Sequence, residues 1–392
     1  MPNTDRSFGD MDELRAIRRD LHAHPELGFE EHRTAGVIAD ELSRLGIPHH
    51  KGIGRTGVVG VIEGRTNRGG RSVGLRADMD ALPLRELTEL PYQSRFEGRM
   101  HACGHDGHVT TLLAAAGHLQ RTRAFDGTVF LIFQPGEEGC GGGRAMVEDG
   151  LFERFPAEKI FALHNWPGLS EGVVSIPSGP VMAAADRIRI RICGQGGHGG
   201  VAPHRTIDPV LVAGHAIVAA HSIVSRNIDP LDAAAVSLCA VQGGDTERGF
   251  AVIPEEVLIV GTARSLRPEV QDLIERRLRE TITSIAASFG ATATFEYERV
   301  LPMTVNSVEE ARFANEVAAE LLGADKVIAE PRPSLGGEDF AYMLQRRPGA
   351  YIHLGSGGDV GLHSPHFDFN DELIPIGGAL FSRLAERALA LS

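Results

Sequence analysis

Short apolar runs recur along the first part of this chain, and segments with helical spacing of apolar residues alternate with them. The runs, each of the length of a single strand, are residues 58–62, 73–75, 128–133 and 160–163. The helical spacing is found over residues 11–21, 37–45 and 110–119. Because parallel strands need long connections, usually helices, this alternation predicts an α/β domain with a largely parallel sheet and helices on both faces.

The periodicity changes near residue 184. Residues 187–192 alternate arginine and isoleucine, which predicts a strand with one buried face. The pattern then predicts a helix, two strands, a helix and a strand, over residues 209–224, 234–241, 251–259, 269–287 and 292–297. This β-α-β-β-α-β order is that of a ferredoxin-like unit.

A chain of 392 residues is long for one hydrophobic core. We therefore expect two domains, with an inserted α+β domain over residues 184–299. The sheet domain consists of residues 1–183 and 300–392, and its later elements include a helix over 308–322 and a strand over 350–354.

The composition is that of a soluble globular protein, with 42% hydrophobic and 23% charged residues. A net charge of −13 disfavours nucleic acid and anionic membranes as partners. No apolar run approaches the roughly 18–20 residues of a membrane span, and residues 1–6 lack the pattern of a secretory signal. We expect a cytoplasmic protein. Its four cysteines are too few for a disulfide scaffold.

Reactive side chains follow several of the predicted strands. Asp78 and Asp80 come after residues 73–75, the pair 137–138 after 128–133, His164 directly after 160–163, and His363 in a glycine-rich loop after 350–354. In open α/β sheets, sites form beyond the carboxyl ends of the strands. Taken singly, His164 and His363 are better explained as structural histidines. Their convergence with the carboxylates indicates a shared site.

The densest group of such side chains is residues 101–108, His-Ala-Cys-Gly-His-Asp-Gly-His. Thiolate and imidazole bind zinc-like divalent ions. In an extended segment Cys103 and His105 would point to the same side. The alternative is a polar loop that enters the helix at Thr110, or a cysteine nucleophile beside His105. The spacing is not that of a zinc finger.

Glu137 and Glu138 are adjacent carboxylates that end a buried-looking strand and precede a run of glycines. They could simply face solvent. Inside a protein they would repel each other unless a cation or a proton intervened. One of them could then bind metal while the other acts as a general base toward water.

Residues 194–200 form another glycine run, with His198 in its middle. The run is either a flexible turn or a loop that presents this histidine to a ligand. It is not a phosphate-binding loop, since no Gly-Lys-Ser/Thr follows.

These segments together resemble the M20 metallopeptidase family, and in particular its amidohydrolase branch of hippurate hydrolases, N-acyl-amino-acid deacetylases and plant auxin-conjugate hydrolases. The matching segments run in family order over nearly the whole chain, at residues 21–31, 75–83, 100–108, 134–138, 162–164, 196–198, 261–264, 337–340 and 362–364. The resemblance implies a zinc-peptidase-like sheet domain interrupted by a lid domain, in agreement with the predicted insertion.

The resemblance also implies roles for individual residues and a site for two divalent metal ions. The implied metal ligands are Cys103, His105, Glu138, His164 and His363. Glu137 would be the general base, with Asp78 as a supporting acid. His198 would stabilise the oxyanion, within one chain or across a dimer, and Arg264 would bind the substrate carboxylate. A thiolate ligand favours Zn, Mn, Co or Ni over Mg or Ca.

The chain departs from the family pattern in two places. Arg76 stands where the wider family has a histidine, as is usual in this branch. Ala251 stands where relatives often have an asparagine, so the substrate preference of hippurate hydrolases should not be transferred.

We predict a hydrolase that cleaves the amide bond of N-acyl amino acids or related small amides. The alternatives are a metal-dependent dipeptidase or carbamoyl-amide hydrolase and, from another class, a non-catalytic binding protein stabilised by metal. A homodimer or higher homo-oligomer is one arrangement that the lid would allow. Its Val212, Ile217 and Val218 could face a second copy, but we expect them to face the lid's own sheet.

Overall fold

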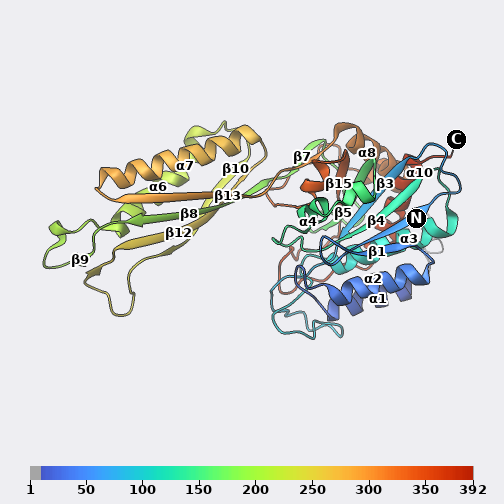
Figure 1. Ribbon diagram of the computed structural model, residues 1–392, viewed down its shortest axis with the longest axis horizontal. Coiled ribbons are helices and arrows are strands. Elements are labelled where there is room, and N and C mark those ends of the chain that lie inside the picture. The colour runs from blue at the N-terminus through green and yellow to red at the C-terminus, as the bar shows by residue number, and fades with distance from the viewer. Residues whose placement is uncertain (1–9, 392) are drawn as a thin grey trace. The chain divides into compact units, whose positions relative to one another are not determined.

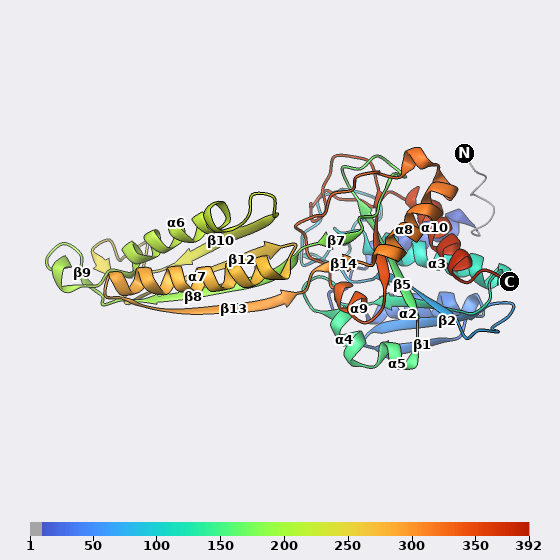
Figure 2. The ribbon, with the colours of Figure 1, turned by 90° about the horizontal axis from the view of Figure 1, so that it is seen from above.

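The computed structural model describes residues 10–391, so the segment on which the absence of a secretory signal was predicted lies outside the described residues. The chain forms two compact units. The first unit contains the described residues up to Val181, together with Thr304–Arg332 and the residues from Asp339 onward. The second unit contains Met182–Met303 and Pro333–Glu338. Figures 1 and 2 show the helices and strands of each unit.

The first unit is built on a seven-stranded sheet with the order β1-β2-β4-β3-β5-β15-β6. Its strands are β1 (His49–Ile53), β2 (Gly57–Glu63), β3 (Ser72–Asp78), β4 (Thr128–Gln134), β5 (Lys159–Trp166), β6 (Val174–Ser175) and β15 (Gly349–Gly355). The central strands β4, β3, β5 and β15 are mutually parallel, whereas β1, β2 and β6 pair antiparallel with their neighbours. The sheet is therefore mixed, with a parallel centre.

Helices cover both faces of this sheet. Gly57 of β2 lies against Met146, whereas Gly60 lies against Leu42. Positions an odd number of residues apart in a strand point to opposite faces, so the helices that carry Met146 and Leu42 are on opposite sides. The helices of the unit are α1 (Met11–Ala23), α2 (His32–Arg44), α3 (His105–Thr122), α4 (Gly142–Glu148), α5 (Leu151–Arg154), α8 (Val308–Leu322), α9 (Ala341–Leu344) and α10 (Leu373–Ala388). The predicted α/β class is confirmed.

One boundary prediction is wrong at the centre of the predicted site. The helix expected to begin at Thr110 begins at His105, so Cys103 and His105 do not share an extended segment. Gly104 precedes the helix with a left-handed φ of 94°. A Cβ atom at this position would lie 2.3 Å from Oδ1 of Asn165, so both the conformation and the space require glycine.

The second unit has a four-stranded antiparallel sheet with the order β10-β12-β8-β13. Its elements are β8 (Ala184–Cys193), β9 (Gly197–His198), α6 (Pro209–Asn227), β10 (Ala234–Gln242), β11 (Val252–Ile253), β12 (Glu256–Ser265), α7 (Pro268–Ser288) and β13 (Thr292–Leu301). Two further short strands of the chain are β7 (Gly179–Met182) and β14 (Thr304–Asn306). The predicted ferredoxin-like order is confirmed.

Strand β8 shows why the second unit folds in this way. Ile188, Ile190 and Ile192 are fully buried and form a core with apolar residues of α6 and α7. The intervening arginines are exposed, and Arg187 pairs with Glu298 of β13 at 2.8 Å. The predicted half-buried strand is thus observed, with a hydrophobic core on one face and ion pairs on the other.

Helix α6 differs from two predictions made from the sequence, one on apolar segments of membrane-span length and one on the side chains that face the sheet. With 19 residues it is long and apolar enough, by length and composition only, to cross a membrane, although core helices of soluble proteins share this property. Val212 is buried in the core of its own unit and Ile217 packs against that core. Val218, in contrast, is 75% exposed, so it does not face the sheet as predicted.

Candidate metal centre

Four adjacent parallel strands bring the predicted reactive groups to one edge of the central sheet. In the order β4-β3-β5-β15, Glu137 and Glu138 follow β4, and Asp78 is the last residue of β3. His164 lies within β5, two residues before its end, and not after it as predicted. His363 lies in the loop that follows β15. The carboxyl ends of parallel strands meet at one edge, which explains this convergence.

Ligand atoms of the residues predicted to bind metal lie close together. Donor atoms of Cys103, Glu138 and His363 are all within 4.8 Å of one another, and so are those of His105, Glu137 and Glu138. Cys103 Sγ lies 3.4 Å from Nε2 of His164. His363 Nε2 lies 3.2 Å from Oε1 of Glu138.

These distances connect the five predicted ligands and Glu137 in one cluster. Most of the cluster is buried, but the side chain of His363 is 55% exposed.

The orientation of His105 depends on Asp80, a residue that was not among the predicted site residues. Asp80 Oδ1 lies 3.2 Å from Nδ1 of His105, and its Oδ2 accepts the backbone N–H of Glu138 at 2.9 Å. A carboxylate can only accept here, so Nδ1 of His105 carries the proton and Nε2 points elsewhere. The sequence did place Asp80 after a strand, which is the signal that could have identified it.

His164 is oriented in a comparable way. Its Nδ1 donates to the backbone carbonyl of Asn165 at 2.7 Å, which leaves Nε2 facing Cys103. Metal-binding histidines commonly donate their second ring nitrogen to a carbonyl or a carboxylate. Both His105 and His164 therefore present Nε2 to the cluster.

His108 also lies within 4.8 Å of donor atoms of Asp78, His105 and His164. Both of its ring nitrogens are already engaged, however. Nδ1 lies 2.5 Å from Oδ1 of Asp78, and Nε2 lies 2.5 Å from Oδ1 of Asn165. His108 is therefore a buried support between β3 and β5, and it has no nitrogen left for a metal ion.

The cluster fits a divalent cation. Among the described residues, Nε2 of His105 is buried and has no hydrogen-bond partner, with its closest carboxylate oxygens 3.9 Å away on Asp78 and 4.0 Å away on Glu138. A buried polar atom without a partner is costly, and a metal ion would satisfy it. Sulfur, imidazole and carboxylate donors together form a ligand set of the kind that zinc-like ions take.

The pKa values of His105 and Cys103 reflect the negative charge of the carboxylates around them. Burial lowers the pKa of His105, but Asp78, Asp80 and Glu138 outweigh it and raise this pKa to about 10. Burial and the nearby carboxylates raise the pKa of the Cys103 thiol well above its usual range. The cluster thus retains protons that a divalent cation would replace, since ligand thiols and imidazoles bind metal in their deprotonated forms.

The remaining predicted residues lie in the second unit. His198 is exposed in β9, and its Nδ1 accepts the backbone N–H groups of Gly200 and Val201 at 3.1 and 3.2 Å. Ala251 lies beside this loop, because its carbonyl accepts the N–H of Gly199 at 2.9 Å. Arg264 is half-buried near the end of β12. Ala251, where the sequence is expected to depart from the family pattern, is therefore adjacent to the loop that carries His198.

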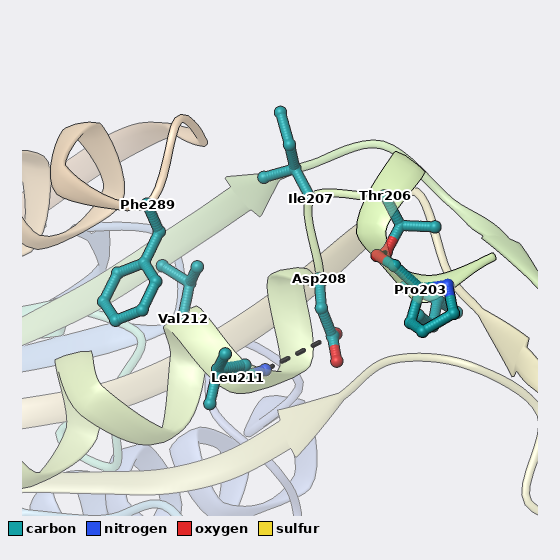
Figure 3. A pocket seen from close by; sticks show the side chains of 8 residues that line it. Pro203, Thr206, Ile207, Asp208, Leu211, Val212 and Phe289 are labelled. Carbon is teal, nitrogen blue, oxygen red and sulfur yellow. Dashed lines mark hydrogen bonds between the residues drawn. The ribbon is translucent and has the colours of Figure 1, made fainter. Parts of the chain in front are cut away.

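The second unit also contains a pocket, which Figure 3 shows from close by. Its lining includes Ile207, Leu211 and Phe289, and none of the predicted site residues. Its one carboxylate, Asp208, accepts backbone N–H groups at the start of α6, including that of Leu211 at 3.4 Å. This acid caps a helix, and the pocket lacks the converging polar groups of a catalytic site.

Comparison with known proteins agrees with this geometry. The sequence profile of peptidase family M20/M25/M40 matches residues 74–387. Hippurate hydrolase of Campylobacter jejuni is 41% identical over 377 residues, which cover 96% of this chain and 97% of that protein. N-acetylcysteine deacetylase of Bacillus subtilis is 39% identical, and the match covers 94% of this chain and 95% of that protein.

A solved structure shows the same fold. The YXEP protein of Bacillus subtilis, a dinuclear metal-binding peptidase from the M20 family, is 34% identical. It superimposes with a TM-score of 0.83, and the match covers 97% of this chain and 98% of that chain. With its sheet domain, its ferredoxin-like unit and its clustered donors, this chain belongs to peptidase family M20/M25/M40 and is a hydrolase of the amidohydrolase branch.

Proposed function

We propose that this enzyme hydrolyses the amide bond of N-acyl amino acids or related small amides, with Glu137 as the general base. The observation that carries the proposal is the position of Glu137, a buried carboxylate whose oxygen lies within 4.8 Å of donor atoms of His105 and Glu138. A structural metal site has no need of such an additional carboxylate. The relatives support the substrate class, because hippurate and N-acetylcysteine are both N-acyl amino acids.

We propose that Cys103, His105, Glu138, His164 and His363 hold two divalent ions, with Zn, Mn, Co and Ni as candidates. When bound, such ions supply Lewis-acid activation of water and of the amide carbonyl. Glu137 takes a proton from water at its carboxylate and returns it to the leaving amine. Asp78 is a supporting acid, held by Arg76 and His108 at 2.7 and 2.5 Å.

We further propose that His198 stabilises the developing oxyanion and that Arg264 binds the substrate carboxylate. The ring of His198 is exposed and its Nδ1 is engaged with the backbone, so Nε2 is the atom that it can offer. The net charge of −13 disfavours nucleic acid and anionic membranes as partners, so we expect small dissolved substrates. We keep the cytoplasm as the proposed location.

A substrate panel with metal-loaded enzyme tests this function. The panel contains N-acyl amino acids, dipeptides and N-carbamoyl amino acids, and the highest kcat/KM is expected for the N-acyl amino acids. A higher value for dipeptides or carbamoyl compounds would show that one of the alternative activities is correct. Bound metal without turnover of any compound would favour the non-catalytic alternative.

The Glu137→Gln variant tests the proposed base. It should retain bound metal and lose activity by a factor of about 100 or more, the usual effect of removing a general base. Glu148→Gln, on the exposed face of α4, is the matched control and should remain fully active. Wild-type activity of Glu137→Gln with metal bound would rule out this role.

A further inference from the structure

Asp339 is a fully buried carboxylate at the start of the segment that leads into α9, and it lies beside the loop between β4 and α4. This loop, residues 135–141, carries Glu137 and Glu138. The backbone N–H of Asp339 donates to Oε1 of Glu137 at 3.4 Å. The contact joins residues that are 202 positions apart in the chain.

The side chain of Asp339 binds both ends of the same loop. Its Oδ1 accepts from Nε2 of Gln134, the last residue of β4, at 2.6 Å. Its Oδ2 accepts the backbone N–H of Gly143, in the first turn of α4, at 2.7 Å. Asp339 therefore contacts Gln134 before the loop, Glu137 within it and Gly143 after it.

Two features make this arrangement specific. A Cβ atom on Gly143 would lie 2.6 Å from the carbonyl oxygen of Asp339, so glycine permits the close approach. Arg76 supplies the opposite charge: its guanidinium reaches Gln134 at 2.9 Å, Asp78 at 2.7 Å and Asp339 at 3.4 Å. A buried carboxylate needs such a charged partner to remain ionised.

We propose that Asp339 is a positioning residue for the general base, holding the carboxylate of Glu137 through its backbone N–H while Gln134, Gly143 and Arg76 fix its own side chain. This inference rests on the proposed role of Glu137. Correct placement of a catalytic group is worth a large factor in rate, because a displacement of about 1 Å can cost roughly 100-fold. Asp339 needs no contact with substrate or metal to have this effect.

The test compares the single variant Asp339→Asn with a double variant in which residues 339 and 134 exchange the roles of hydrogen-bond acceptor and donor. The asparagine has the same size, but its NH₂ group must face a donor, so one of the bonds to Gln134, Gly143 or Arg76 is lost. We expect kcat to fall by about 10-fold to 100-fold, with KM and metal content unchanged. In the double variant Asp339→Asn/Gln134→Glu, the amide donates and the carboxylate accepts, which should restore most of kcat.

Asn306→Asp is the control for the cost of an isosteric change at a buried polar residue. Asn306 is buried and its side chain bonds Pro177 and Tyr351. This variant should lower Tm and leave kcat unchanged. If Asp339→Asn does not fold, the single variant Gln134→Glu, which places a second carboxylate against Asp339, should show the same loss of kcat.

Wild-type kcat for Asp339→Asn, a change in metal content or KM in place of kcat, or no recovery in the swap would each overturn the proposal. Glu137→Gln separates this failure from that of the proposed function. If Glu137→Gln is inactive while Asp339→Asn is fully active, only the positioning role is wrong. If Glu137→Gln is fully active, the role of the base itself is wrong.

Discussion

One carboxylate, Asp80, holds two of the proposed metal ligands: its Oδ1 lies 3.2 Å from Nδ1 of His105, and its Oδ2 accepts the backbone N–H of Glu138 at 2.9 Å. Asp80→Asn should therefore weaken metal binding by about 10-fold to 100-fold, as is typical when the partner of a metal-binding histidine is removed. Competition with a chromogenic chelator measures this affinity. Asp40→Asn, at an exposed position of α2, is the control and should bind metal normally. Unchanged affinity in Asp80→Asn would show that Asp80 does not orient His105.

Removal of metal should abolish activity and lower Tm. The buried Nε2 of His105 loses its proposed partner, and a ligand that binds only the folded state stabilises that state. We expect Zn, Mn, Co or Ni to restore turnover, whereas Mg and Ca should fail because they bind thiolate poorly. Activity assays and thermal unfolding on chelated and reloaded samples measure both effects. A chelated sample with full activity would contradict the metal-dependent mechanism.

His22 should make stability depend on pH. Burial lowers its pKa, but Asp106, which lies 2.8 Å away, and Glu86 outweigh burial and raise this pKa to about 9. A histidine with a raised pKa stabilises the fold fully below about pH 6.5, its unfolded value, and this contribution is lost as the pH rises through 9. The free energy of unfolding in urea should therefore fall across this range.

His22→Gln should lower stability at pH 6 and flatten the decline between pH 6.5 and 9. His24→Gln, at the end of the same helix, is the control and should keep the wild-type slope. An unchanged slope in His22→Gln would mean that other groups cause the pH dependence.

Two glycines should respond in opposite ways to alanine. A Cβ atom on Gly142 would lie 1.6 Å from the carbonyl oxygen of Pro135, in the loop that carries Glu137 and Glu138. Gly142→Ala should destabilise the protein by at least about 1–3 kcal/mol and reduce activity. Gly36 of α2 has no atom within 4 Å of such a Cβ, so Gly36→Ala should stabilise by about 0.5–1 kcal/mol. Urea unfolding measures the free energy of unfolding of both variants. Equal changes for the two substitutions would contradict this prediction.

The regular elements were predictable because their hydrophobic periodicity is local. The alternation of residues 187–192 predicted a half-buried strand, and β8 buries its isoleucines and exposes its arginines. The helix over 308–322 has the predicted bounds. The start of α3 was missed because its first turn, from His105 to His108, is polar although it is buried. Contacts with distant residues such as Asp80, Asp78 and His22 make this burial possible.

The sequence by itself determined that carboxylates, imidazoles and a thiol follow the strands of a parallel sheet centre, and that a β-α-β-β-α-β unit is inserted. Both follow from local periodicity and from the order of motifs. Only the tertiary structure decided which side-chain atoms are free to bind a metal ion and which are already hydrogen-bonded. It engages both nitrogens of His108, frees Nε2 of His105 and brings Asp339 to Glu137. The physical reason is that buried polar atoms must find partners, and here the partners come from segments up to 202 residues away in the chain.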